Sequence, residues 1–153
     1  MALWQASYRL VPLEFSVEEM DPEAPWVSAD PPEGIVDIAA HTLALPPSPL
    51  SWAQDARHWG RDDSHDMTAW YEGGQLQSVQ ARLDLRADDW PEVASRLAAA
   101  GLQLGAIFQR EDGAQVFPDS ADLIEDIRSS EAFAFVQDPI GVLSRKRPTD
   151  THS

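Results

Sequence analysis

The chain has 153 residues, no cysteine, and 26 acidic against 11 basic side chains, which gives a formal net charge of −15. Without cysteine it has no disulfide, no thiolate metal ligand and no thiol nucleophile. The negative charge disfavours binding to nucleic acid and to anionic lipid, because phosphate binding requires cations that displace counterions. The N-terminus has no cationic segment followed by a long apolar one, so we expect a cytoplasmic protein without a membrane partner.

The chain length predicts one domain over residues 1–143, followed by a flexible polar tail at 144–153. The opening LWQASYRLVPLEF alternates loosely and predicts a strand that Pro12 ends. Residues 16–34 are rich in proline and acidic side chains, which predicts a long acidic loop. The segment GIVDIAAHTLAL predicts a short helix stopped by PPSPL. Its expected buried face consists of Ile35, Ile38, Ala39 and Thr42.

The clearest local signal is a hairpin formed by MTAWYE and QLQSVQARLDLR around Gly73 and Gly74. Paired glycines supply the positive φ angles that a two-residue turn needs. Alternate positions of the second strand are apolar, so we expect one buried face and one wet face. The predicted buried positions are Val79, Ala81, Leu83 and Leu85.

The segment ADDWPEVASRLAAAG predicts a helix with Asp88 as N-cap, Pro91 in the first turn and Gly101 as the C-terminal stop. A second hairpin follows, with a glycine at its turn. The next helix is expected to begin with Asp119 or Ser120 as its cap. The segment FAFVQDP predicts a short closing strand.

This order of elements indicates an α+β fold. Hairpins that alternate with helices favour an antiparallel sheet with helices on one side. We therefore predict a sheet built from two hairpins and flanking strands, with about three helices packed mainly on one face.

The stretch HWGRDDSHDM is the best candidate for a metal or catalytic site. Divalent ions bind imidazole nitrogen and carboxylate oxygen. The stretch carries such groups at His58, Asp62, Asp63, His65 and Asp66. Their spacing matches neither H-E-x-x-H nor a calcium-binding loop. We therefore predict a solvated turn before a strand, without metal, cofactor or catalytic residue. A small metal-dependent enzyme that uses His58, Asp62 and His65 is the alternative.

The tryptophans divide between core and surface. Trp70 and Trp90 fall near strand and helix starts and are expected in the core. Trp26 lies in the acidic segment and is expected outside, where tryptophan often anchors a partner.

Three short motifs lie between Leu50 and Pro139. They are W-G-x-x-D at Trp59 to Asp63, R-[ILV]-D-[ILV]-R at Arg82 to Arg86, and F-x-F-V-x-D-P at Phe133 to Pro139. With these motifs and its acidic hairpin, the chain resembles a group of small acidic bacterial proteins, some of which act as immunity proteins beside secreted or contact-dependent toxins. The resemblance implies a non-enzymatic cytoplasmic inhibitor whose partner is a basic toxin domain.

Acidic side chains are expected at the partner interface, because an anionic surface can occupy the basic groove of a toxin that attacks nucleic acid. An adaptor subunit of a secretion or phage-like assembly, in which the charge serves solubility, is a further alternative. The predicted partner-binding residues are Glu18, Glu19, Asp21, Glu23, Trp26, Asp62, Asp63 and Asp66.

Overall fold

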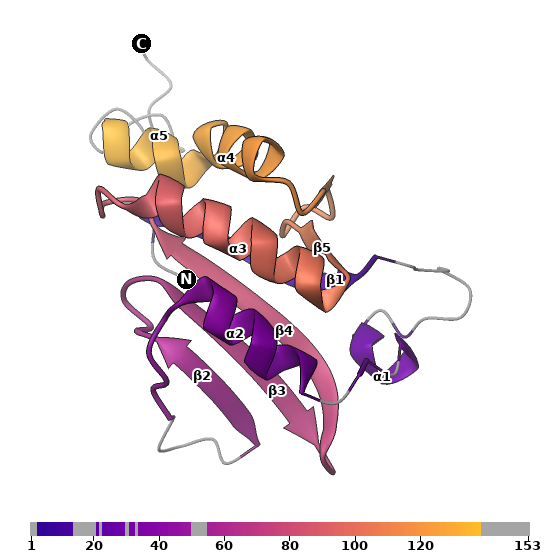
Figure 1. Cartoon of the computed structure of the whole chain (residues 1–153). Helices are drawn as coiled ribbons and strands as arrows, with labels where there is room; N and C mark the ends of the chain where they lie inside the picture. Colours follow the sequence, from indigo (N-terminus) through magenta and orange to yellow (C-terminus); the bar gives the residue numbers. More distant parts are fainter. Residues whose placement is uncertain are drawn as a thin grey trace, which may run out of the picture.

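The computed structural model describes residues 3–13, 21, 23–29, 31, 32, 34–49 and 55–138. These residues form an α+β fold around one antiparallel sheet, which confirms the predicted class (Figure 1). The sheet has six strands in the order β2-β3-β4-β1-β5-β6, so the first strand of the chain lies inside the sheet. The strands are β1 (Gln5–Pro12), β2 (Ala56–Gly60), β3 (Asp66–Glu72), β4 (Gln75–Asp84), β5 (Ala106–Gln109) and β6 (Gln115–Val116).

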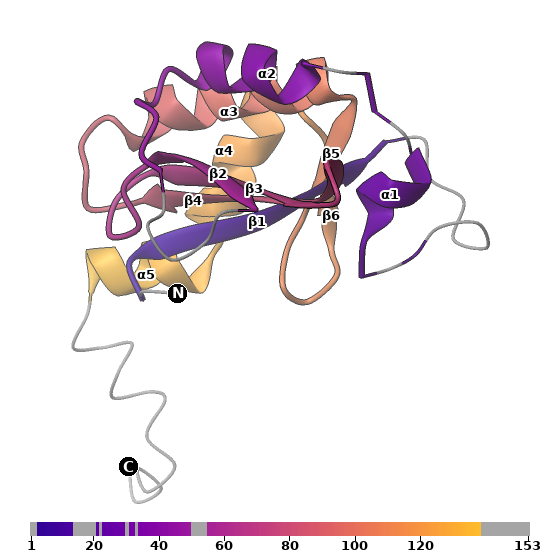
Figure 2. The same ribbon diagram turned by 90° about the horizontal axis from the view of Figure 1, so that it is seen from below.

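Five helices accompany the sheet in the described part of the chain, where about three were predicted. Helices α2 and α3 lie side by side on one face of the sheet, and α4 packs against α3 (Figure 2). The longest of them, α3, has 15 residues, and no helix among the described residues has the length and apolarity to cross a bilayer. The helices are α1 (Pro25–Ala29), α2 (Ile35–Leu43), α3 (Trp90–Leu104), α4 (Ser120–Arg128) and α5 (Glu131–Gln137).

Strand β1 has a hydrogen-bonded neighbour on each side. Tyr8 stands opposite Ala81 of β4, and Leu10 stands opposite Val79 of β4 and Phe108 of β5. As predicted, the strand ends at Pro12. Because of this position, β1 joins two hairpins that are separated in sequence by α3.

The β3–β4 hairpin forms around Gly73 and Gly74, as predicted. Their φ angles are +59° and +80°, in the left-handed region that a tight two-residue hairpin turn requires. The alternation along β4 is also confirmed, because Val79, Ala81 and Leu83 are buried. Burial of this face orients β4 and fixes its register with both neighbours.

Helix α2 forms as predicted, but its buried face differs from the expected one. Val36, Ala40 and Leu43 are buried together with Ala39, whereas Ile38 is 54% exposed. Both stripes have helical spacing, so periodicity alone did not select the one that faces the sheet and α3.

The prediction that Gly101 ends α3 was wrong. The helix continues to Leu104 and ends at Gly105, whose φ is +66°, and Asp89 rather than Asp88 precedes its first residue. Gly101 instead lies against a buried ring, because a Cβ atom there would stand 2.7 Å from Cζ of Phe108. Close packing between α3 and β5 therefore explains this glycine.

The predicted closing strand FAFVQDP was also wrong, since residues Glu131–Gln137 form α5. The hydroxyl of Ser130 accepts the N–H of Phe133 at 3.1 Å and caps the helix. Phe133 packs edge-on against Trp90 with ring centroids 5.8 Å apart. Phe133 and Val136 both contact the core. These two residues are three positions apart, which fits a helix, whereas the apolar run FAFV alone is also compatible with a strand.

The packing of Gly101 makes a stability prediction. Gly101→Ala gains roughly 1 kcal/mol of helix propensity but forces a methyl group into the Phe108 ring. We expect a net loss of about 1–3 kcal/mol in the free energy of unfolding, measured by urea denaturation. The control Leu102→Ala changes a neighbouring side chain that is 64% exposed and should shift stability by less than about 0.5 kcal/mol. Equal effects of the two substitutions would contradict the packing explanation.

Candidate functional site

The turn RDDSH, predicted as a solvated lead into a strand, connects two strands. Sequence analysis overlooked β2, which pairs with β3 along its length. The turn closes with an N–H to carbonyl bond of 3.0 Å from Arg61 to His65. Gly60 allows this approach, because its φ is +84° and a Cβ atom would stand 2.1 Å from the carbonyl oxygen of His65.

Asp66 was predicted to be exposed and available to a partner, and this exposure is wrong. Its carboxylate is buried, with 1% of the side chain accessible. It accepts a hydrogen bond from Nε–H of Arg82 at 2.8 Å and a second one from Nη2 of the same guanidinium. It also lies 2.9 Å from Nε2 of His58. Asp66 stands opposite Arg82 in the register of β3 and β4, so pairing across the sheet places the carboxylate beside its cation.

Both nitrogens of the buried His58 ring are engaged within the fold. Nδ1 lies 2.9 Å from the carbonyl oxygen of Ser48, and Nε2 lies 2.9 Å from the carboxylate of Asp66. An oxygen atom of the fold therefore occupies the position beside each ring nitrogen where a metal ion or a substrate would have to bind.

The ring of His65 is held in the same way. Nδ1 accepts the backbone N–H of Asp84 at 3.0 Å, which leaves Nε2 to donate to the carboxylate of Asp89 at 3.0 Å. A general base needs a free nitrogen, and a metal ligand needs an open lone pair, so this geometry offers neither. Among the residues that the structure describes, no group of three or more histidines and carboxylates is arranged to hold a metal ion.

Two loops meet at this point and form an acidic corner, which we define as Asp62, Asp63, Asp88 and Asp89. All four residues are exposed, so the predicted exposure of Asp62 and Asp63 is confirmed. The hydrogen bond from His65 to Asp89 joins the β2–β3 turn to the loop before α3. The role of Asp62 and Asp63 in partner binding remains a prediction.

The acidic corner is held by side chains that the sequence did not connect with it. Gln5, which is 2% exposed, donates from Nε2 to the carbonyl oxygens of Asp62 at 3.2 Å and Ser64 at 2.6 Å. Arg86 donates to the carbonyl oxygen of Asp63 at 3.2 Å. A polar residue on the first strand gave no signal of this contact, because it depends on the order of the strands.

Asp84 anchors the loop that leads to α3. Its burial opposes ionisation, yet the bonds from the side chain and backbone N–H of Arg86 hold its pKa below the usual value. The Arg86 guanidinium also lies over the Trp4 ring, 4.0 Å from its centroid. These contacts tie the β4–α3 loop, and with it part of the acidic corner, to the β2–β3 turn and to Trp4.

The predicted acids of the N-terminal segment are only partly described. Glu18 and Glu19 lie outside the described residues, as does the tail at 144–153. Asp21 and Glu23 are exposed, as expected, and the carboxylate of Asp21 accepts the N–H of Glu23 at 2.9 Å.

Trp26 was predicted to lie outside, which is wrong. Only 2% of this residue is accessible, and its Nε1–H donates to the carbonyl oxygen of Leu10 at 2.9 Å. The short helix α1 thus turns the ring into the core, a placement that the acidic character of the segment concealed. Trp90 is buried as predicted, and Trp70 is only partly buried.

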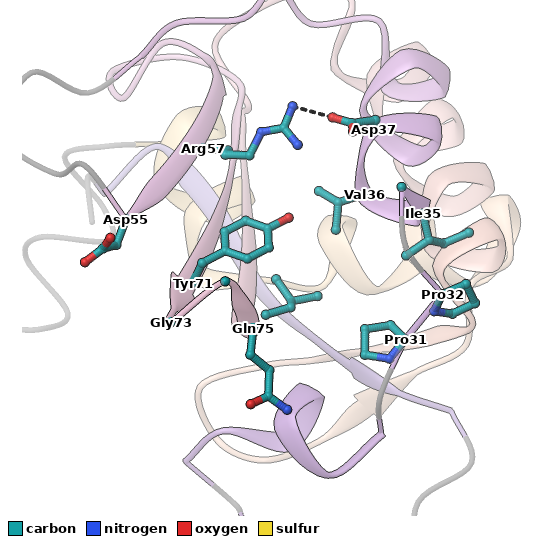
Figure 3. A pocket seen from close by; sticks show the side chains of 13 residues that line it. Pro31, Pro32, Ile35, Val36, Asp37, Asp55, Arg57, Tyr71, Gly73 and Gln75 are labelled. Carbon is teal, nitrogen blue, oxygen red and sulfur yellow. Dashed lines mark ion pairs between the residues drawn. The ribbon is translucent and has the colours of Figure 1, made fainter.

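A cavity of about 800 Å³ opens between α2 and the ends of β2, β3 and β4. Figure 3 shows the Arg57 side chain extended toward Asp37, with the Tyr71 ring below Arg57. Pro31 and Pro32 lie on the opposite side of the cavity from Tyr71. Arg57 forms an ion pair with Asp37 and lies 5.3 Å from the centroid of the Trp59 ring. Partial burial raises the pKa of the Tyr71 hydroxyl. The described lining residues offer apolar surface and an arginine neutralised by Asp37, and among them no nucleophile is paired with a base.

No protein-family model, curated protein or solved structure matches the chain. The resemblance to immunity proteins therefore remains a prediction, and the function is inferred from the geometry of the site itself.

The buried carboxylate of Asp66 makes a clear prediction. Asp66→Asn leaves the Arg82 guanidinium without its buried counter-charge and removes the carboxylate that faces the His58 ring, so we expect a loss of about 2–4 kcal/mol in the free energy of unfolding. Asp62→Asn, four residues earlier on the exposed turn, is the control and should change stability by less than about 0.5 kcal/mol. Urea denaturation at pH 7 measures both. Similar losses at the two positions would show that burial of Asp66 is not decisive.

The lowered pKa of Asp84 predicts a dependence of stability on pH. Because the folded carboxylate has the lower pKa, its contribution is complete above the ordinary value of about 3.9 and is lost as the pH falls through the folded value. Asp84→Asn should therefore cost about 1 kcal/mol at pH 7, reduced by the exposure of Arg86, and the difference from the parent protein should shrink as the pH falls below about 3.9. Thermal unfolding from pH 7 to pH 2 measures this difference. A constant gap across that range would contradict the ion-pair explanation.

Proposed function

We propose that the chain is a non-enzymatic protein-binding module that acts in the cytoplasm as an immunity protein against a basic toxin domain. The observation that carries the proposal is the acidic corner, whose exposed carboxylates stand on loops held by buried polar side chains. The charge of −15 and the resemblance of the motifs support the same function.

The acidic corner is organised before any partner arrives. Gln5 fixes the backbone of the turn, and His65 joins that turn to the loop before α3. Ordering flexible loops and side chains opposes association, so a surface already held in place binds at a smaller entropic cost. A rigid anionic surface suits a rigid basic groove.

The charges of the acidic corner are only partly neutralised by its own arginines. Arg61 reaches Asp63 at 3.4 Å, and Arg86 is engaged with the buried Asp84. Asp62 and Asp88 form no ion pair with any residue that the structure describes. These two carboxylates therefore remain available to steer and to meet cationic side chains of a partner.

The histidines favour this function over the metal-dependent alternative. Each ring nitrogen of His58 and His65 already has a partner in the fold. The pair holds strands and loops together, which is a structural contribution to the acidic corner. A metal-dependent reaction at these residues would first have to break contacts that organise the turn.

The proposal is tested by combining Asp62→Asn with Asp88→Asn. Protein bound to the tagged chain at low salt is identified by mass, purified, and titrated against the chain by calorimetry. Protection of a cell from its own toxin requires a dissociation constant in the nanomolar range, about −12 kcal/mol. We expect the double variant to weaken binding about tenfold or more and to reduce its dependence on salt.

Glu72→Lys is the matched control for this experiment. It changes the net charge by the same two units as the double variant, but at the exposed end of the β3–β4 hairpin. Binding should be nearly unchanged by Glu72→Lys. Equal weakening by the control and the double variant would show that binding depends on overall charge and not on the acidic corner. A partner that binds only with a micromolar dissociation constant would exclude the immunity function.

A further inference from the structure

A shallow groove of about 430 Å³ lies between the edge strand β6 and helix α4. Phe117, directly after β6, is 62% exposed and forms part of the groove wall with Val116. An exposed phenylalanine beside a groove is an apolar contact without an occupant in the described chain. Asp122 and Glu125 of α4 line the opposite wall.

The two edges of the sheet differ. At the β2 edge, Pro47 forms a bridge to Trp59, and the N–H of Ser48 donates to the carbonyl oxygen of His58 at 2.8 Å. At the other edge, β6 pairs only with β5 among the strands described. One edge of the sheet is thus covered, and the other offers backbone groups to a further strand.

The register of β5 and β6 identifies these backbone groups. Arg110 donates its N–H to the carbonyl oxygen of Ala114 at 2.9 Å, and Gln109 stands opposite Gln115 at the next position. Antiparallel pairs alternate between bonded and unbonded positions, so the N–H and C=O of Gln115 are directed away from β5.

The groove has negative charge despite its arginine. Arg110 is engaged by Asp112 at 2.8 Å and by Asp126 at 2.9 Å, and the hydrogen bond to Asp112 raises its pKa. The carboxylate of Asp126 also accepts the hydroxyl of the buried Tyr8 at 2.6 Å. Burial raises the pKa of that tyrosine, and the bond to Asp126 raises it further.

Two acids of the groove have no cationic partner in the part of the chain that the structure describes. Asp122 and Glu125 form no ion pair with the described residues, and both are exposed. The walls of the groove therefore combine an apolar ring, a strand edge and two unpaired carboxylates. A segment that satisfies all three must be extended, partly apolar and basic.

We propose that this groove binds an extended basic segment of a partner protein. The segment pairs with the Gln115 backbone, places an apolar side chain against Phe117, and directs lysine or arginine toward Asp122 and Glu125. Since β6 has only two residues, side-chain contacts supply most of the affinity. The assignment goes beyond the proposed function and does not depend on the acidic corner.

The test uses a defined probe, the peptide acetyl-Lys-Val-Lys-Leu-Lys-Ser-amide, added to the isotope-labelled full chain at low salt. We expect backbone amide shifts confined to Gln115, Val116, Phe117 and the facing turns of α4. Phe117→Ser should weaken binding about fivefold or more, as loss of an interface aromatic does. Glu125→Lys should weaken it to a similar extent, and raised salt should do the same. The peptide with glutamate in place of each lysine should not bind.

Leu102→Ser is the matched control, because it also removes a large exposed apolar side chain, 64% accessible, but on α3. It should leave peptide binding unchanged. Absence of shifts in the groove, equal binding of the glutamate peptide, or equal losses for Phe117→Ser and Leu102→Ser would each overturn the proposal.

The result of the peptide experiment can be distinguished from the result of the experiment that tests the immunity function. The combined Asp62→Asn and Asp88→Asn variant should bind the peptide like the parent chain. If the peptide does not bind, the groove proposal is excluded and the immunity proposal is unaffected. If the acidic-corner variant still binds its protein partner, the immunity proposal is contradicted and the groove proposal is unaffected.

Discussion

Strand β1 pairs with β4 on one side and with β5 on the other, and the remaining architecture depends on this double pairing. Without it, the sheet would divide into the three strands β2-β3-β4 and the short hairpin β5-β6, and that hairpin is too small to bury an apolar face alone. The same strand also reaches both candidate surfaces. Gln5 holds the turn of the acidic corner, and Tyr8 holds Asp126 beside the groove of α4. One buried strand thus fixes the position of charged groups at two distant parts of the sequence.

The hairpins could be predicted because their information is local. Paired glycines and the alternation from Val79 to Leu83 determine a turn and a buried face without knowledge of the other elements. The end of the chain could not be predicted in this way. The segment FAFVQ satisfies both strand and helix spacing, and the choice is made by the Ser130 cap and by the contact of Phe133 with Trp90. That contact links residues far apart in the sequence, so tertiary packing overrides the local pattern.

The candidate site was predictable in its location but not in its details. Asp62 and Asp66 look alike in the sequence, yet one is exposed and the other is buried against Arg82 and His58. The difference comes from cross-strand register, which required β2 to be recognised. Had HWG been assigned to a strand paired with β3, alternation would have placed His58 and Asp66 on the same face. Gln5 carried no such signal, because its contact depends on the order of the whole sheet.

Charge and shape make different contributions to recognition by such a protein. A net charge of −15 attracts any basic protein, so it raises the rate of encounter without discriminating among basic partners. Selection requires contacts that only one surface can complete, such as an aromatic ring beside a strand edge. Phe117 stands beside two acids that form no ion pair in the described part of the chain, and the acidic corner stands on loops held by the side chains of Gln5 and His65. A partner that merely carries positive charge would satisfy neither arrangement, since the first requires an extended apolar segment and the second a fixed spacing of cations.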